Sequence, residues 1–482
     1  MTRVRAAAAA VAVAATIAVP AGPALAGRTL PCIPHEAVDG RCEQWAAAYS
    51  GTAFDSTRAV TLSPDGRTVF VAGETETDDG LRVLTAAYEV VEGGQRWAKV
   101  DGRDGDEYDS ASAIAVSPDG SSVFTLANAC GATTDGSTCD GFLIARDPST
   151  GEERWSALFD GEGHGLDGFM GIGVDPASDT VFVGGQTASP RGDTDYLLGA
   201  YDAATGDLLW STTYGDPAGP DRAAGLALAR HTVILTGRSL GTEDAEDIVT
   251  VAFDTRPSRE GEVVWEARYD GPGGSDEALA IDVDERGEVV AVAGESQRAT
   301  SPLPDPVVAA YDAGSGSQRW VRRFDDAGQL GGTFYDVAVS PKGEHVVATG
   351  YTQRSGGTAG AKGPSTLAYD AASGLRRWAI NLPEGLNMDA EFGPDGRHVY
   401  VTGSTYTRRG SMHRTVSYLS ETGAQRWIGL HEATALPYSE QSTVLYPSAL
   451  AVSPDGTNVY VTGSHRPMFG THDDALTLSY QA

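Results

Sequence analysis

Short apolar segments separated by turn residues run along most of the chain, and the same order of segments recurs eight times. In one copy, Ala59 to Ser63 leads into the turn Pro64-Asp65-Gly66, and Val69 to Gly73 follows at once. An alternation of apolar and polar residues that is bounded by proline, aspartate and glycine is typical of β-strands joined by tight reversals. Each copy contains four such segments, so the pattern predicts four-stranded antiparallel blades.

One tryptophan occurs in the fourth segment of each copy. The eight are Trp45, Trp97, Trp155, Trp210, Trp265, Trp320, Trp378 and Trp427, with spacings of 49 to 58 residues. This period predicts an all-β fold, an eight-bladed β-propeller with four antiparallel strands per blade. The last copy stops after its third segment, whereas the strand from Cys42 to Tyr49 has no three segments before it. We therefore expect the N-terminal strand to pair with the C-terminal blade and close the ring.

The first 26 residues have the features of an export signal. Arg3 and Arg5 precede an apolar run over residues 6–19, and Ala24-Leu25-Ala26 resembles a cleavage site. We expect residues 1–26 to be a signal peptide, 27–41 an N-terminal extension and 42–482 a single propeller. The mature protein is thus predicted to be secreted and extracellular, and no later stretch is apolar enough to predict membrane insertion.

Four cysteines form two local pairs. Cys32 lies near Cys42, and Cys130 lies near Cys139. In an oxidising compartment such pairs predict two disulfides, each closing one loop. Zinc is disfavoured because neither pair has a C-x-x-C spacing and no histidine cluster accompanies them in the sequence.

The chain is strongly acidic. Its formal net charge is −31 and falls to −33 when Arg3 and Arg5 leave with the signal peptide. Such a surface repels phosphate backbones and anionic lipid, so nucleic acid and membrane surfaces are not expected partners. Acidity of this kind also keeps an extracellular protein soluble.

The connection between the third and fourth segments carries a motif. Ala200 to Trp210 has Ala first, Asp third, Gly seventh and Trp last, and it resembles the tryptophan-docking motif of pyrroloquinoline-quinone-type propeller repeats. The resemblance implies that the tryptophans are structural and dock neighbouring blades. The motif recurs at Ala145 to Trp155, Ala310 to Trp320 and Ala368 to Trp378. Three further copies depart from it: Ala87 to Trp97 has Glu89 in place of the Asp, Ala252 to Trp265 has three extra residues, and Ser417 to Trp427 has Leu419 in place of the Asp.

The other half of each copy is similar to bacterial extracellular propellers with G-x-x-D-x-A and V-x-V-T-G repeats, as in Gly274 to Ala280 and Val399 to Gly403. These two resemblances support the fold and say little about activity.

The quinone-type resemblance implies a quinoprotein dehydrogenase as one candidate. Those enzymes have adjacent, disulfide-linked cysteines above the quinone and a calcium ion held by Glu, Asn and Asp side chains. This chain has no adjacent cysteines, and the calcium ligands match no motif in it. Pyrroloquinoline quinone is therefore not expected as a cofactor.

Aligning the copies identifies an aspartate four residues before the core of the first strand in five of them. These are Asp55, Asp109, Asp167, Asp221 and Asp276, while Gly332, Gly385 and Leu445 occupy the other three positions. If these aspartates approach the channel mouth, they predict a cation site, with calcium as the ion because it takes several carboxylate oxygens. The alternative is that each aspartate caps its own loop backbone. Repetition in five blades favours the caps, because a unique site does not need the same residue in every blade.

Histidines offer two further candidates. His164, between Glu162 and Asp167, is the best single candidate for a metal ligand or acid–base group, followed by His465 and His472 beside Asp473 and Asp474. Each is also compatible with a solvated loop residue. No nucleophile elbow or phosphate-binding loop occurs in the sequence.

The two classes of connection differ in length. The first-to-second and third-to-fourth connections are short, whereas the other two are long and irregular, and each class belongs to one face of a propeller. Variable loops on a rigid scaffold are where binding sites usually lie. We therefore expect a monomeric, non-catalytic binding or scaffold module that uses its acidic long-loop face for a protein, glycan or small ligand. The alternative is an enzyme, a metal-assisted hydrolase, lactonase, lyase or diverged quinoprotein, with its site at the channel mouth.

Overall fold

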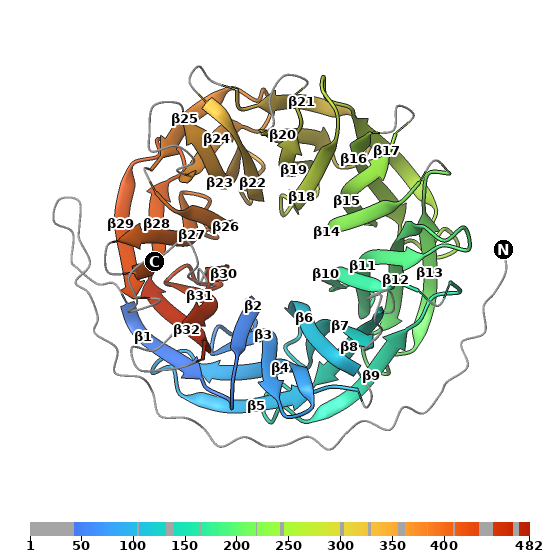
Figure 1. Ribbon diagram of the computed structural model, residues 1–482, viewed down its shortest axis with the longest axis vertical. Helices are drawn as coiled ribbons and strands as arrows, with labels where there is room; N and C mark the ends of the chain where they lie inside the picture. Colours follow the sequence, from blue (N-terminus) through green and yellow to red (C-terminus); the bar gives the residue numbers. More distant parts are fainter. Residues whose placement is uncertain are drawn as a thin grey trace.

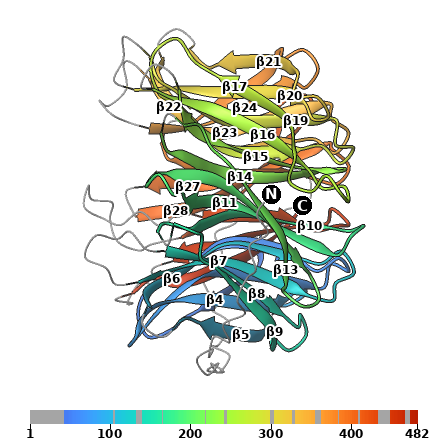
Figure 2. The ribbon, with the colours of Figure 1, turned by 90° about the vertical axis from the view of Figure 1, so that its right-hand side faces the viewer.

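The computed structural model describes residues 43–103, 106–131, 139–163, 165–217, 219–241, 245–298, 303–325, 329–354, 362–382, 384–407, 410–432, 447–465 and 472–482. They form 32 strands arranged as eight blades around a central channel (Figure 1). Figure 2 shows the ring edge-on. The predicted all-β, eight-bladed architecture is confirmed. Within these residues, no helix exists that is long and apolar enough to cross a membrane.

The strands follow the predicted order, and each blade begins with its innermost strand. Blades 1 to 4 contain β2 (Asp55–Leu62), β3 (Thr68–Thr77), β4 (Gly80–Glu89), β5 (Gln95–Asp101); β6 (Asp106–Val116), β7 (Val123–Gly131), β8 (Cys139–Arg146), β9 (Glu153–Phe159); β10 (Gly168–Asp175), β11 (Thr180–Ala188), β12 (Thr194–Asp202), β13 (Leu208–Tyr214); β14 (Asp221–Ala229), β15 (Thr232–Leu240), β16 (Glu246–Asp254) and β17 (Val263–Tyr269). Blades 5 to 8 contain β18 (Asp276–Val283), β19 (Val289–Ser296), β20 (Asp305–Asp312), β21 (Gln318–Arg323); β22 (Gln329–Val339), β23 (His345–Arg354), β24 (Lys362–Asp370), β25 (Arg376–Asn381); β26 (Leu386–Phe392), β27 (His398–Thr407), β28 (Gly410–Leu419), β29 (Gln425–Glu432); β30 (Pro447–Val452), β31 (Asn458–His465), β32 (Asp474–Gln481) and β1 (Glu43–Tyr49).

The outer strand of blade 8 comes from the N-terminal part of the chain. β1 runs antiparallel to β32, with Trp45 opposite Ser479 and Tyr49 opposite Ala475. The two lie side by side in blue and red in Figure 1. Blade 8 thus has the sheet order β1-β32-β31-β30.

Each blade interface is packed with side chains that the strand alternation directs between the sheets. The cluster between blades 4 and 5 contains Ile248, Trp265, Val290, Val292 and Tyr311, all buried. Equivalent clusters recur at the other interfaces. The core is therefore distributed around the ring, and each blade contributes to two clusters.

The tryptophan side chains reach from one blade to the next. Trp265 Nε1 donates to the carbonyl of Ala313 at 2.9 Å, in the third-to-fourth turn of the following blade. Gly316 of that turn has φ +69°, and a Cβ there would lie 2.6 Å from the Trp265 ring, which explains the motif glycine. The same hydrogen bond, from Nε1 to a carbonyl at the equivalent turn position of the following blade, is formed by Trp45, Trp97, Trp155, Trp320 and Trp378.

Trp210 and Trp427 are the exceptions. The turn that Trp210 faces belongs to the copy with three extra residues. Trp427 Nε1 is buried and has no acceptor in the described part of the chain. In blade 8, the turn that would supply an acceptor is replaced by the two ends of the ring, β32 and β1.

The disulfide predicted between Cys130 and Cys139 is present, across the neighbouring strands β7 and β8. Cys32 and Cys42, the expected signal peptide and the extension over residues 27–41 lie outside the described residues.

Candidate functional site

Every innermost strand has a β-bulge at the same position. In β18, Ala278 and Ala280 pair with consecutive residues of β19, so Leu279 is extra. The extra residues of the eight blades are Arg58, Ser112, Met170, Ala224, Leu279, Tyr335, Met388 and Ser448. Unlike the repeated tryptophans, these residues differ in kind from blade to blade.

The glycine of the V-x-V-T-G motif lies opposite this bulge. A Cβ on Gly294 would lie 1.9 Å from the carbonyl oxygen of Glu277, and the positions equivalent to Gly294 in blades 1, 3, 4, 6 and 7 are equally tight. Blade 2 has Ala127 there, and its inner strand has a second irregularity between Asp106 and Tyr108. The glycine therefore allows the bulged backbone to approach the second strand.

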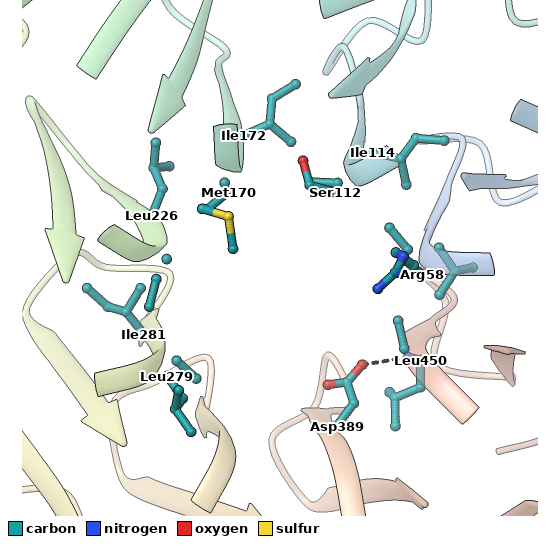
Figure 3. Close-up of a pocket in the computed structure, with 18 residues that line it drawn as sticks. Arg58, Ser112, Ile114, Met170, Ile172, Leu226, Leu279, Ile281, Asp389 and Leu450 are labelled. Atoms are coloured by element: carbon teal, nitrogen blue, oxygen red, sulfur yellow. Dashed lines mark hydrogen bonds between the residues drawn. The ribbon is translucent and has the colours of Figure 1, made fainter. Parts of the chain in front are cut away.

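The bulge residues of blades 1 to 5 line a cavity of about 350 Å³ in the central channel (Figure 3). Most of its lining residues have aliphatic side chains, although the surface exposed to the cavity is more polar than apolar. Met170 is 46 % exposed. Arg58, Ser112 and Asp389 are the polar groups labelled around the opening. Arg58 forms a two-point ion pair with Glu74, at 2.9 and 3.0 Å. The apolar side chains are Ile114, Met170, Ile172, Leu226, Leu279, Ile281 and Leu450.

Four carboxyl groups that no sequence motif reveals lie on the inner strands of blades 5 to 7. Each accepts a hydrogen bond from a backbone N–H of the following blade's inner strand. The donor–acceptor pairs are Val339 N with Asp282 at 2.7 Å, Ala390 N with Asp336 at 2.8 Å, Leu450 N with Asp389 at 2.6 Å, and Val452 N with Glu391 at 3.1 Å. At the Asp336 and Asp389 position, blades 1 to 4 have alanine or glycine. Because these small residues leave space, the cavity forms on their side of the channel.

Enclosure by the protein makes these carboxyl groups weaker acids. Burial raises the pKa of Asp282 to about 6 and raises the pKa of Asp336 and Glu391 well above the usual carboxyl range. Asp336 and Asp389 are hydrogen-bonded to each other, and two carboxylates in such contact share a proton. The pair can therefore hold one proton between its two carboxyl groups, an arrangement suited to binding a donor or exchanging a proton.

The five repeated aspartates are fully buried at the start of the innermost strands. Each accepts a hydrogen bond from a backbone N–H of the preceding loop. The donors to Asp55, Asp109, Asp167, Asp221 and Asp276 are Gly51, Arg103, Gly161, Asp216 and Gly271. None of the five lines the channel cavity. Burial raises the pKa of Asp55 and Asp221 to about 6.

Two of these aspartates lie close to further carboxylates in the described chain. Ligand oxygens of Asp140, Asp160 and Asp167 lie within 4.8 Å of one another, as do those of Asp247, Asp270 and Asp276. An arginine already pairs with one member of each group, Arg103 with Asp140 at 2.8 Å and Arg268 with Asp247 at 3.0 Å. The chain thus supplies positive charge itself, and the calcium site stays a prediction.

The remaining sequence candidates are dispersed. His164 and Leu445 lie outside the described residues, and His472 is exposed. His465 lies in a group with two other histidines that sequence spacing did not reveal. The bulge residues could have been found, because each follows the aligned aspartate position by three residues.

The chain forms four-stranded blades around a channel, and in six blades a tryptophan donates a hydrogen bond to a turn of the next blade. These features define a β-propeller with quinone-type repeats. The family model described as outer membrane protein assembly factor BamB matches residues 37–324 and 304–466, and the chain belongs to this family. No curated protein matches the chain.

Solved propellers with low sequence identity share the fold. Sqt1 from Chaetomium thermophilum, bound to the N-terminus of the ribosomal protein L10, is 12 % identical at a TM-score of 0.55, covering 90 % of this chain and 100 % of its own. The Dos1 propeller is 12 % identical at a TM-score of 0.53, covering 91 % of this chain and 95 % of its own. The C-terminal WD40 domain of Sif2 is 10 % identical at a TM-score of 0.52, covering 89 % of this chain and 97 % of its own.

Proposed function

We propose that the protein is an exported, non-catalytic binding module that holds part of a partner protein in the central channel, entered from the long-loop face. The supporting observation is the set of bulge residues. They vary from blade to blade on inner strands that otherwise share a repeated bulge, and five of them line one cavity. A repeated scaffold with a variable bulge residue in each blade suits recognition of a single asymmetric partner.

The chemistry of the cavity favours a partner segment with an aliphatic side chain and a hydrogen-bond donor. Aliphatic side chains contribute apolar surface beside the polar groups of the lining, and Met170 adapts its shape readily to a ligand. Asp389 offers a carboxyl acceptor at the cavity edge. The Sqt1 propeller was solved with a protein segment bound, so a fold of this kind accommodates such a ligand.

A capture experiment tests this proposal. The mature chain, immobilised, is exposed to culture supernatant beside two variants, Met170→Arg in the cavity and Leu375→Arg in a tight turn of the opposite face. Leu375 is 68 % exposed, so its replacement controls for added charge. We expect wild type and Leu375→Arg to retain the same partner, and Met170→Arg to lose at least 10-fold in affinity because a buried unpaired charge opposes binding.

Equal capture by all three proteins would contradict the proposal. One observation favours the enzyme alternative, namely the shared proton between Asp336 and Asp389, which resembles an acid–base pair. Turnover of esters or lactones by wild type that is abolished in Asp389→Asn would favour that alternative over the binding module.

A further inference from the structure

The outer strand of blade 3 differs from the other seven outer strands. β13 contains no charged residue, whereas each of the others contains at least one. β13 is the last strand of its sheet and pairs with β12, so its other edge pairs with no strand of the described chain (right-hand rim of Figure 1). Charged side chains on an edge strand oppose pairing with another chain. β13 therefore lacks a protection that the other outer strands have.

Two exposed leucines begin this strand. Leu208 is 37 % exposed and Leu209 is 52 % exposed. The equivalent residues of blade 4, Val263 and Val264, are exposed as well, whereas the other six blades have only Gln, Glu or Arg at these two positions. Large apolar residues that replace polar ones at a repeated surface position, in two adjacent blades, indicate a contact surface.

Leu209 also removes an ion pair that the repeat supplies elsewhere. In blades 2, 5 and 6 the residue before the tryptophan is an arginine whose Nη2 donates to Oδ2 of the motif aspartate. The pairs are Arg154 with Asp147 at 2.9 Å, Arg319 with Asp312 at 3.3 Å, and Arg377 with Asp370 at 2.8 Å. In blade 4, two arginines of the lengthened turn, Arg256 and Arg259, pair with Asp254 instead. Blade 3 has the motif aspartate, Asp202, and no described arginine pairs with it.

One carboxylate oxygen of Asp202 is consequently available to a cation from outside the chain. Its Oδ1 accepts hydrogen bonds from the backbone N–H groups of Ala204 and Thr205, both at 2.9 Å. Oδ2, the atom that arginine contacts in the other blades, has no partner among the described residues. A lysine or arginine of another molecule can occupy the place of the missing arginine and form a charge-assisted hydrogen bond there.

These features together define the chemistry of a partner. The free strand edge suits an extended backbone, the exposed leucines suit an apolar side chain, and Asp202 suits a cation beside it. A second copy of this chain fits poorly, because its net charge is also −31 and its own β13 carries no cation to offer. The partner is therefore a different protein with a basic, extended segment.

We propose that the free edge of β13 binds an extended segment of a partner protein, which adds a strand to blade 3 and places a lysine or arginine on Asp202. Backbone hydrogen bonds along the edge supply affinity, and the cation at Asp202 selects the sequence and the register of the segment. No residue of β13 lines the channel cavity, so this surface is separate from the site proposed there.

Calorimetric titration of the full mature chain with synthetic peptides tests the proposal. The probes are peptides as long as β13, of alternating threonine and valine, that carry one arginine at successive positions, together with matched peptides that carry glutamate instead. At least one arginine peptide should bind with a Kd of about 100 µM or below, and its glutamate counterpart should bind about 10-fold more weakly or less.

Two variants separate the ion pair from the rest of the surface. Leu209→Arg gives blade 3 the arginine of blades 2, 5 and 6, so it should pair with Asp202 and weaken the arginine peptide about 10-fold or more. Asp202→Asn should remove the preference for arginine over glutamate. Leu375→Arg is the control, because Leu375 is exposed in a turn of blade 6, and it should bind the peptides as wild type does.

Thermal unfolding separates a binding defect from a folding defect, because Leu209→Arg should melt at the wild-type temperature or above it. The proposal is overturned if no peptide binds, if arginine and glutamate peptides bind wild type equally, or if Leu209→Arg binds the arginine peptide as wild type does. Dimerisation of wild type in sedimentation that Leu209→Arg abolishes would also overturn it, in favour of a second copy at this edge. Met170→Arg should leave peptide affinity unchanged, so the channel proposal stands or fails separately.

Discussion

Residues that repeat and residues that do not have different roles in this molecule. Asp55, Asp221 and Asp276 each accept a hydrogen bond from the loop that leads into their own strand. Asp336 and Asp389 belong to the inner strands of only two blades, and they hydrogen-bond both to each other and to the next blade. The repeated carboxylates therefore stabilise local structure, whereas the unrepeated pair links neighbouring blades and places Asp389 at the channel cavity.

The shared proton of this pair makes stability depend on pH. Burial raises the pKa of Asp336 well above its value in the unfolded chain. The stabilising effect of its protonated form is complete below the unfolded pKa, about 4, and is lost as pH rises through the raised folded value. We expect Asp336→Asn, whose amide donates to Asp389 at any pH, to be more stable than wild type by about 1 kcal/mol at pH 8 and equally stable at pH 4.

Urea unfolding between pH 4 and pH 8 measures this difference, with the exposed Asp78→Asn as control. A variant that is less stable than wild type at pH 8 would show that Asp336 is needed as an ionised group.

At the scale of the strand, close backbone approach determines the sequence motif. Gly294 faces the bulge of β18, where a side chain would collide with the Glu277 carbonyl. We expect Gly294→Ala to destabilise the protein by about 3 kcal/mol or to prevent folding, because the Cβ is fixed to its backbone and collides with a backbone carbonyl, so neither atom can rotate away. Gly94→Ala should change stability by less than about 0.5 kcal/mol, since a Cβ there would lie 4.0 Å from its nearest neighbour, the Glu89 carboxylate. Chemical denaturation of both variants checks this, and equal stability would disprove the steric explanation of the motif.

Elements that repeat could be predicted, and elements that depend on spatial neighbours could not. The spacing of Trp265 and Trp320 predicted the blade period, and Pro64-Asp65-Gly66 predicted a tight turn, because both signals are local. The pair of Asp336 and Asp389 joins two blades, and His413 and His465 come from different blades. Residues that meet only after the sheets pack leave no periodic signal in the chain.

At the scale of the whole molecule, one strand connects the two ends of the propeller. β1 supplies Trp45 and Tyr49 to the cluster between blades 8 and 1, and both side chains are buried. Deleting residues 27–49 should therefore expose the edge of β32 and lower the melting temperature of the entire ring by more than about 10 °C, since a large apolar interface is lost. Deleting only residues 27–41 is the control and should have a smaller effect. Unaltered melting of the longer deletion would show that the pairing of β1 with β32 contributes nothing to stability.

Under the proposed binding role, the β-bulges give this propeller a way to change its specificity without changing its framework. Because each blade adds one extra residue at the same height, substituting Ala224 or Leu279 alters the channel and leaves the neighbouring strand pairing in place. In that role, single changes at the five bulge positions that line the cavity would alter the ligand, and a library restricted to those positions would sample new binding surfaces on one unchanged ring.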